Sequence, residues 1–207
     1  MAKTWRALAV IVMLTLLVSA PAAAQSVQGG IKGGISFSTM DGLGEVFGNL
    51  PQLNTESRIN WVAGVFVKVN LGTFFAFQPE VLYVRKGAKA AVTGVFTESI
   101  TYNLNYIDIP LLARVQTSRG TGLYLLAGPS IGLNVTATVE DEAGETEDVK
   151  DEINTSDMGL VIGAGVELAH VLVEGRYTQG LSNIIKDAEG EESVKNRAIS
   201  LLFGIRF

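Results

Sequence analysis

From residue 27 onward, large apolar residues alternate with small or polar ones, and this period of two constrains the fold more than any other feature. In the final segment, Phe203 and Ile205 alternate with Gly204 and Arg206. Successive side chains of a β-strand point to opposite faces of its sheet, so such a segment has one apolar face and one small or polar face. Eight segments of this kind can be distinguished, which predicts eight strands.

The second face of these segments consists mostly of glycine, serine and a few charged residues. It would be a poor exterior for a water-soluble barrel, but it suits a narrow interior when the apolar face contacts lipid. A Lys or Arg that faces lipid at mid-membrane costs roughly 2–4 kcal/mol, which explains why the apolar face carries almost no charge. We therefore predict an all-β fold, an eight-stranded antiparallel up-and-down transmembrane β-barrel. A soluble barrel that binds a greasy molecule in its centre is the alternative.

The lengths of the connections between these segments point the same way. Short and long connections alternate along the chain. Outer-membrane barrels have tight turns on the periplasmic side and longer loops outside, and a soluble β-protein has no reason to sort its loops like this. The short turns lie at 71–72, 118–120 and 169–170, and the long connections at 41–58, 86–99, 137–156 and 181–195.

The start of the chain has the features of a secretory signal peptide. A positive beginning and an apolar run of about a dozen residues precede small residues at a cleavage site. The marking residues are Lys3, Arg6, Ala22 and Ala24. The run is short for a membrane-spanning helix, which needs roughly 20 residues. We predict that 1–24 is a signal peptide cleaved after Sec-type export and that 25–207 is a barrel domain in the bacterial outer membrane. An uncleaved amino-terminal anchor is the alternative.

Composition excludes several functional classes. The chain contains no cysteine, so disulfides, thiolate metal sites and cysteine nucleophiles are ruled out. The formal net charge is −5, and no basic patch is concentrated enough for nucleic-acid binding. We predict no cofactor. Because proline cannot donate a ladder hydrogen bond, we expect the three prolines within predicted strands to mark bulges or strand ends. They are Pro79, Pro110 and Pro129.

The polar face carries more charge than a narrow lumen can hold unpaired. Its cations are Lys32, Lys68, Arg114, Arg176 and Arg206, and its anions are Glu80, Asp108, Glu167 and Glu174. The interior of an eight-stranded barrel is just wide enough for side chains to fill. An unpaired buried charge costs several kcal/mol, so we expect these residues to form an ion-pair network that closes the lumen. A gated ion path through the same groups, or catalysis by Glu80 with Asp108, is the alternative.

The single histidine of the chain does not indicate an active site. His170 lies in a short turn predicted on the periplasmic side, and that turn has no serine partner for it. A hydrolase would need another nucleophile and base, and the sequence offers none. We therefore predict a solvated turn histidine and a protein that is not an enzyme.

One long connection is strongly acidic. Carboxylates suit hard cations such as Ca²⁺ or Mg²⁺, but the spacing here lacks the pattern of an EF-hand loop. We interpret the segment as a solvated loop, with weak divalent-cation binding as the alternative. The carboxylates concerned are Glu140, Asp141, Glu142, Glu145, Glu147 and Asp148.

The chain ends in an aromatic residue on the apolar face of its last strand. Phe207 follows Phe203 and Ile205 on that face. A terminal aromatic on an amphipathic last strand is similar to the signal that the barrel assembly machinery reads. We predict that machinery and outer-membrane lipid as partners, and no nucleic acid.

Several segments stand out in order along the chain: 78–83 with 86–88, 106–112, 128–132 and 176–181, among which Tyr-Ile-Asp-Ile-Pro-Leu-Leu at 106–112 is the most recognisable. Together they resemble the PorT-like outer-membrane β-barrel family over nearly all of 25–207. The resemblance implies an eight-stranded barrel of unassigned biochemical role, without catalytic residues.

These observations favour a non-enzymatic outer-membrane barrel with a side-chain-filled lumen and a role in envelope structure or surface interaction. A narrow transport or secretion-accessory barrel is the second hypothesis. An outer-membrane lipid enzyme is the third.

Overall fold

A computed structural model describes the chain over residues 26–41, 53–56, 58–86, 89–93, 97–140, 146–148, 156–182 and 195–207. The predicted signal peptide, residues 1–24, lies outside these ranges. Among the described residues there is no helix long and apolar enough to cross a membrane.

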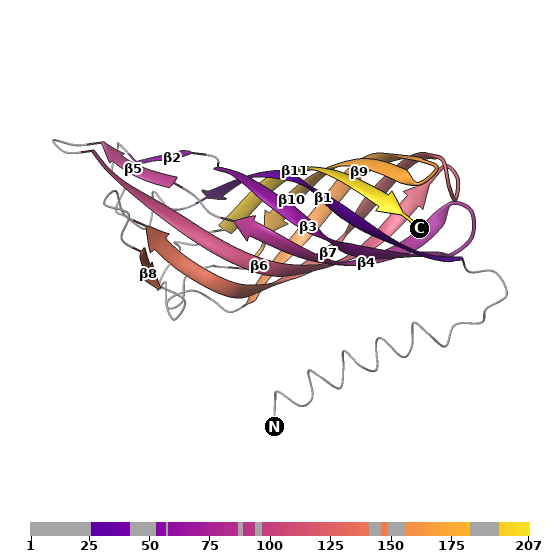
Figure 1. Ribbon diagram of the computed structural model, residues 1–207, viewed down its shortest axis with the longest axis horizontal. Coiled ribbons are helices and arrows are strands. Elements are labelled where there is room, and N and C mark those ends of the chain that lie inside the picture. Colours follow the sequence, from indigo (N-terminus) through magenta and orange to yellow (C-terminus); the bar gives the residue numbers. More distant parts are fainter. Residues whose placement is uncertain are drawn as a thin grey trace, which may run out of the picture.

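Eight long strands form a closed antiparallel barrel within the described part of the chain (Figure 1). Each pairs with the next long strand along the chain, and the first pairs with the last, so the eight long strands close into a ring. This confirms the predicted all-β, eight-stranded fold. The strands are β1 (Val27–Asp41), β3 (Arg58–Asn70), β4 (Phe75–Lys86), β6 (Thr97–Gln116), β7 (Gly122–Glu140), β9 (Ser156–Leu168), β10 (Val171–Gly180) and β11 (Lys195–Arg206).

Three short strands extend the sheet at one end of the barrel and were not predicted. β2 (Leu53–Glu56) pairs with β5 (Lys89–Thr93), β5 pairs with β6, and β8 (Thr146–Asp148) pairs with β7. In Figure 1 they lie at the opposite end from the carboxyl terminus and the short turns. Because short turns face the periplasm in outer-membrane barrels, we call the end with the short turns the periplasmic end and the other the outer end.

The pairing around the barrel is strongly staggered. We can follow paired residues from each strand to its neighbour once around the barrel. A path that starts at Phe74 comes back to the same segment of chain at Val84, ten residues further along. Between them it passes Gln116, Tyr124, Gly165, Glu174, Leu202, Gly34 and Val62. A stagger of this kind tilts the strands against the barrel axis, and eight tilted strands enclose a space that side chains can fill.

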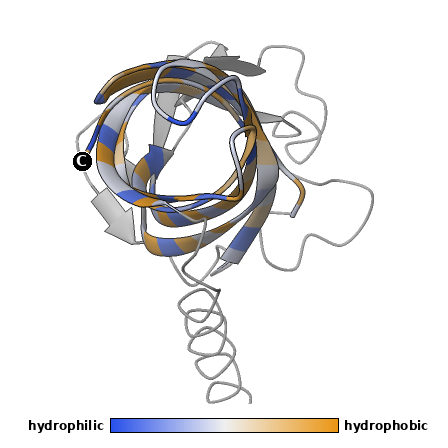
Figure 2. Cartoon of the chain, turned by 90° about the vertical axis from the view of Figure 1, so that its right-hand side faces the viewer, coloured by the Kyte–Doolittle hydropathy of each residue, from blue (hydrophilic) through white to orange (hydrophobic). Residues whose placement is uncertain are grey.

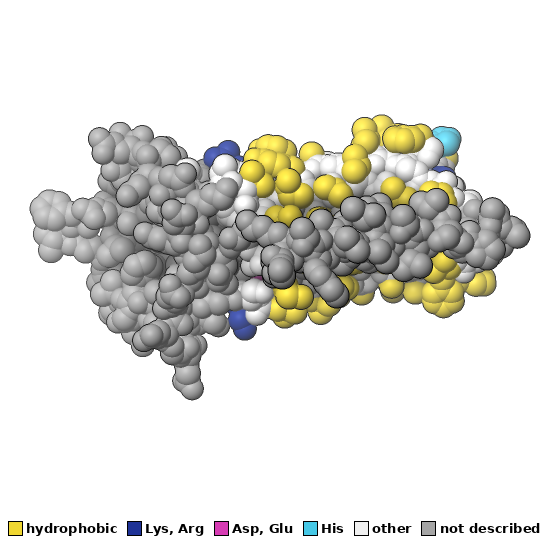
Figure 3. All heavy atoms as spheres, turned by 90° about the horizontal axis from the view of Figure 1, so that it is seen from below, with side chains coloured by type: hydrophobic (Ala, Val, Ile, Leu, Met, Phe, Trp, Pro, Cys, Tyr) yellow, Lys and Arg dark blue, Asp and Glu magenta, His cyan; other side chains and the backbone are white. Residues whose placement is uncertain are grey.

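The two faces of each strand separate as the alternation predicts. In β11, Leu201 and Phe203 are 39% and 54% exposed, whereas Leu202 between them is 1% exposed. Orange and blue bands alternate along the strands in Figure 2, and apolar side chains cover much of the barrel wall in Figure 3. Trp61 and Tyr83 stack on this outer face with their ring centroids 5.2 Å apart. The exposed apolar wall is the surface that a lipid-facing barrel needs.

Glycines on the inner face make room for large side chains of the neighbouring strand. A Cβ at Gly165 would lie 2.4 Å from the hydroxyl of Tyr124, and a Cβ at Gly30 would lie 2.3 Å from the ring of Phe66. Both aromatic side chains are buried. The glycines of the inner face therefore leave the space that the few bulky residues of the lumen occupy.

The expectation for the prolines was wrong. All three lie inside long strands, and the register on either side of each is the same, so none marks a bulge or a strand end. The paired positions are instead interrupted next to Pro79 and Pro110. A proline lacks only one donor, which points to one neighbouring strand, so the ladder with the other neighbour can continue. The register shift in β6 lies between Asn105 and Tyr106.

The close contact between Gly165 and the side chain of Tyr124 gives a direct test of the interior packing. Gly165→Val should destabilise the folded barrel by about 1–3 kcal/mol, because the new side chain would displace Tyr124 from the lumen. Gly175→Val, on the adjacent strand, is the matched control, because a Cβ there meets no atom within 4 Å. Urea unfolding in lipid vesicles, followed by the loss of heat-modifiable migration on gels, measures both. Equal stability of the two variants would contradict the packing described here.

Candidate functional site

Eight of the nine charged residues predicted for the lumen come together in two ion-pair clusters. They belong to seven strands, and each occupies a position whose side chain points to the inside of the barrel. All are buried except Arg206, whose side chain is 11% exposed. We define the periplasmic cluster as Lys68, Arg114, Glu167 and Arg206, and the central cluster as Lys32, Glu80, Glu174 and Arg176.

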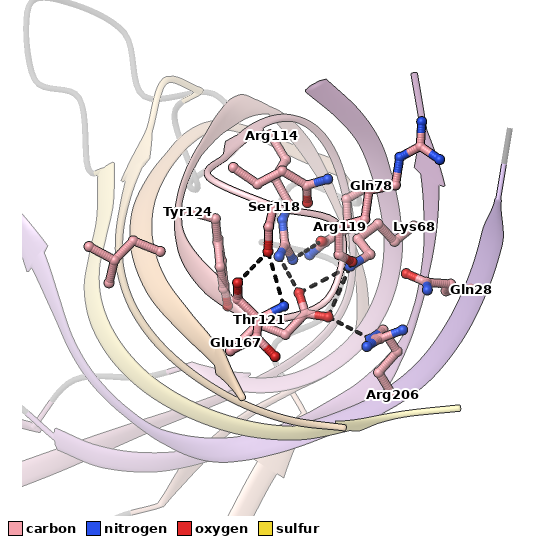
Figure 4. A network of polar contacts seen from close by, with 12 residues as sticks. Gln28, Lys68, Gln78, Arg114, Ser118, Arg119, Thr121, Tyr124, Glu167 and Arg206 are labelled. Atoms are coloured by element: carbon pink, nitrogen blue, oxygen red, sulfur yellow. Dashed lines mark hydrogen bonds and ion pairs between the residues drawn. The ribbon is translucent and has the colours of Figure 1, made fainter. Parts of the chain in front are cut away.

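The periplasmic cluster is built around one carboxylate (Figure 4). Lys68 Nζ donates to both oxygens of Glu167, at 2.9 and 3.0 Å. Arg114 donates to the same carboxylate, and Arg206 Nε lies 2.5 Å from Glu167 Oε1. Glu167 stands on β9 and these partners come from β3, β6 and β11, so Glu167 joins opposite walls of the barrel.

The central cluster pairs two cations with two anions. Lys32 Nζ lies 2.9 Å from Glu80 and 3.4 Å from Glu174. Arg176 lies 2.7 Å from Glu80 Oε1 and also donates to Glu174. Each cation therefore contacts both carboxylates, and the charges of the cluster balance. Such complete pairing offsets part of the cost of burying charge.

Two uncharged polar side chains connect the clusters, and they were not among the predicted site residues. Gln78 donates to Glu80 at 2.7 Å and accepts from Arg114 at 3.0 Å. Tyr124 donates its hydroxyl to Glu174 at 2.8 Å, while the guanidinium of Arg114 lies 3.7 Å from its ring centre. The alternation places both residues on the inner face, but it does not show which charges they contact.

The outer half of the lumen is different, because its described polar contacts are mainly between uncharged groups and its cavities are small. Asn60 donates to Ser38 at 2.8 Å, and Ser200 donates to Ser36 at 2.9 Å. Two cavities of about 20 and 40 Å³ lie here, with space for one or a few water molecules each. Asp108, the ninth predicted charge, is buried and lines the larger cavity together with Arg176.

Apolar side chains also occupy the inner face, which sequence interpretation described as mostly small or polar. One buried group consists of Val62, Leu82, Val84 and Leu202. It borders the larger cavity on the outer side of the central cluster. The lumen is thus filled by ion pairs and by packed apolar side chains.

The remaining predicted residues lie apart from the clusters. His170 is exposed in the turn between β9 and β10, with Nδ1 3.1 Å from the carbonyl oxygen of Arg206. Phe207 is 75% exposed at the periplasmic end, and its backbone nitrogen donates to Gly29. The acidic residues from Glu140 to Asp148 lie outside the residues whose side chains the structure describes.

The described charged residues are held mainly by one another in a narrow interior. Among the described side chains, no three metal-ligating groups lie close enough together to hold a metal ion. Glu80 is held by two cations and by Gln78, while Asp108 lines a cavity of about 40 Å³, too small for a lipid or sugar substrate. The arrangement fills and braces the lumen.

Comparison with known proteins gives a family match. Residues 23–186 match the family model described as outer membrane protein beta-barrel domain. No curated protein matches the chain. The match concerns the outer-membrane barrel in general, and nothing in it supports a PorT-like assignment specifically.

Several solved structures are similar in fold at low sequence identity. The attachment invasion locus protein Ail of Yersinia pestis, solved with the heparin analogue sucrose octasulfate, is 15% identical with a TM-score of 0.46, covering 88% of this chain and 99% of that one. Neisserial surface protein A is 12% identical with a TM-score of 0.49, covering 88% and 99%. OprG of Pseudomonas aeruginosa is 11% identical with a TM-score of 0.45, covering 89% and 97%.

The two clusters predict an order of stability among variants. Glu167→Gln should destabilise the barrel by about 3–5 kcal/mol, because three cations lose their shared carboxylate. Arg114→Ala should cost less, since Lys68 and Arg206 still neutralise Glu167. Arg119→Ala is the control, because it removes one hydrogen bond of an exposed guanidinium to the Gly72 carbonyl and no ion pair, and it should cost the least of the three. Urea unfolding midpoints in lipid vesicles measure all three, and an unchanged midpoint for Arg114→Ala would contradict the pairing argument.

Proposed function

Because the chain belongs to the outer membrane protein β-barrel domain family, we propose that it is a non-enzymatic outer-membrane barrel whose filled lumen makes it a rigid scaffold for its outer loops. The observation that carries this proposal is the pair of ion clusters, which occupies the lumen with side chains from opposite walls. A scaffold needs a stable wall and a closed interior, and it needs no reacting group.

The long connections at the outer end support a role at the cell surface. The connections predicted as long, over 41–58, 86–99, 137–156 and 181–195, join strand ends at the outer end and make up a large share of the sequence. Loops carried by a rigid scaffold are a common place for binding residues. We propose contacts with other surface components through these loops, and the acidic segment over 140–148 is the part suited to divalent cations.

Export and assembly belong to the same proposal. The leader-like segment over 1–24 supports Sec-type export, and the exposed aromatic Phe207 at the periplasmic end supports recognition by the barrel assembly machinery. A PorT-like subgroup, suggested by the motifs over 78–83 and 106–112, would imply the same kind of barrel without catalytic residues.

The second hypothesis, a narrow transport barrel, would need a path through both clusters. In the described part of the lumen, the cavities on the outer side of the clusters hold only a few waters, and the charged groups are bound to one another. An ion would have to break several charge-assisted hydrogen bonds to pass, and these are the stronger kind.

Planar lipid bilayers separate the scaffold from a transport barrel. The wild-type protein should show no stable discrete conductance, because paired side chains close its lumen. The double variant Arg114→Ala, Arg176→Ala removes one arginine side chain from each cluster and should show small discrete steps. Heat-modifiable migration of both proteins, recovered from the vesicles used for insertion, controls for folding. Stable discrete steps in the wild-type protein would overturn the proposal in favour of transport.

A lipid enzyme is tested separately. Wild-type protein in mixed micelles should release no product from phospholipid or lipid A. Hydrolysis that is abolished by one substitution of a polar lumen residue, such as Asp108→Asn, while the barrel still folds, would establish the enzyme instead.

A further inference from the structure

An open apolar groove crosses the outer face of the wall over β6, β7, β9, β10 and β11. Its volume is about 760 Å³, whereas the two cavities of the outer lumen measure about 20 and 40 Å³. Four outward positions along it carry a methyl group or no side chain, and larger apolar residues flank them. The small residues are Ala113, Ala127, Ala164 and Gly175, and the flanking residues include Val115, Leu125, Ile162, Tyr177 and Ile199.

The groove rises toward the outer end of the barrel from β6 to β11. One row of cross-strand pairs runs along it, and this row joins Ala113, Ala127, Ile162, Tyr177 and Ile199 in that order. The stagger of the barrel moves such a row outward as it passes from strand to strand in this direction. The groove therefore comes closest to the outer membrane surface at Tyr177 and Ile199.

A cation stands directly beyond this end of the groove. Arg197 precedes Ile199 by two residues on β11, so its exposed side chain belongs to the same outward face, one position nearer the outer end. On β10, the hydroxyl of Tyr177 donates to Gln179 at 2.6 Å, and Gln179 is paired with Arg197. The polar end of Tyr177 thus points toward the row of Arg197. Tyrosine is typical of the level where lipid chains meet headgroups.

Arg197 has the chemistry to bind a lipid phosphate at that level. A guanidinium has five N–H donors, so it can contact an external acceptor in addition to partners within the protein. Its planar fork can donate two parallel hydrogen bonds to a phosphate. The residues paired with Arg197 are Thr39 and Gln179, which are both uncharged.

A second apolar groove of the wall lacks this combination. Its volume is about 570 Å³, and Gly33, Ala63 and Phe203 line it. The next outward residues on these three strands are apolar, so no cation follows this groove toward the outer end. They are Ile35, Trp61 and Leu201.

We propose that the first groove seats an acyl chain of a phosphate-bearing lipid of the outer leaflet, whose phosphate contacts Arg197. The apolar groove suits the chain, and the cation at its outer end matches the charge of the headgroup. A basic residue near the membrane surface attracts anionic lipid. The site lies on the wall rather than in the loops, so it stands or falls separately from the scaffold proposal.

The test uses the chain refolded in deuterated maltoside micelles, with protons retained on the alanine and isoleucine methyl groups. Phosphatidic acid is the probe, because it combines acyl chains with a phosphate. A glucosyl diacylglycerol with the same acyl chains is the comparison without phosphate. Nuclear Overhauser effects from acyl chains to the methyl groups of Ala127 and Ile199 report the groove. The Nε–Hε resonance of Arg197 reports the phosphate.

Two variants each have a matched control. Arg197→Gln removes the proposed phosphate ligand, and Arg85→Gln removes an arginine from the outward face of β4, which does not line the groove. Ala164→Leu fills the first groove, and Ala63→Leu fills the second. Heat-modifiable migration on gels shows that each variant is folded.

Phosphatidic acid should shift the Arg197 resonance saturably, and Arg197→Gln should weaken the apparent affinity about tenfold, the loss expected for one charge-assisted hydrogen bond. Arg85→Gln should leave the affinity unchanged. Ala164→Leu should abolish the Overhauser effects at Ala127, and Ala63→Leu should preserve them.

Three results would overturn the proposal. Equal affinity for the two lipids would show that the phosphate is not recognised. Overhauser effects of equal strength at Ala63 and Ala127 would show ordinary solvation of the wall by lipid. Effects at Ala127 that come from a second copy of the chain, with none from lipid, would assign the groove to a dimer.

Discussion

Every backbone N–H and C=O group that lies in lipid must find its partner within the protein, and closure of the eight-stranded sheet meets this requirement. Because β1 pairs with β11, no strand of the barrel wall is left with an open edge. Closure also fixes the other properties of the molecule. The wall must be apolar outside, and the strand stagger leaves a narrow interior that side chains have to fill.

The interior is filled largely with charge, and this charge also holds the barrel together across its width. Lys32 on β1 pairs with Glu174 on β10, and Lys68 on β3 pairs with Glu167 on β9, so residues far apart in sequence meet at the axis. Apolar packing around Val62 and Leu202 seals the region next to the central cluster. The central cluster is neutral, whereas the periplasmic cluster is cationic.

Alternation in the sequence predicted which side chains face the lumen, because the period of a strand is a local property of the backbone. It placed Arg114, Glu167 and Arg176 inside. It could not predict which cation meets which anion, because partners such as Lys68 and Glu167 are brought together by the stagger of the whole barrel. The connecting roles of Gln78 and Tyr124 depend on the same stagger. The short strands β2, β5 and β8 lie where no alternation is visible, and the prolines were misjudged because a ladder interruption does not require a shift in register.

The central claim is that the apolar face of the wall contacts lipid, and the chain contains a native probe of it. With Trp5 replaced by phenylalanine, Trp61 is the one tryptophan, and its side chain is 49% exposed on the outer face. In vesicles that contain brominated phosphatidylcholine, the account predicts strong quenching of Trp61 fluorescence and little quenching by aqueous acrylamide. Strong quenching by acrylamide with none by the brominated lipid would contradict the account, because it would place the apolar wall in water.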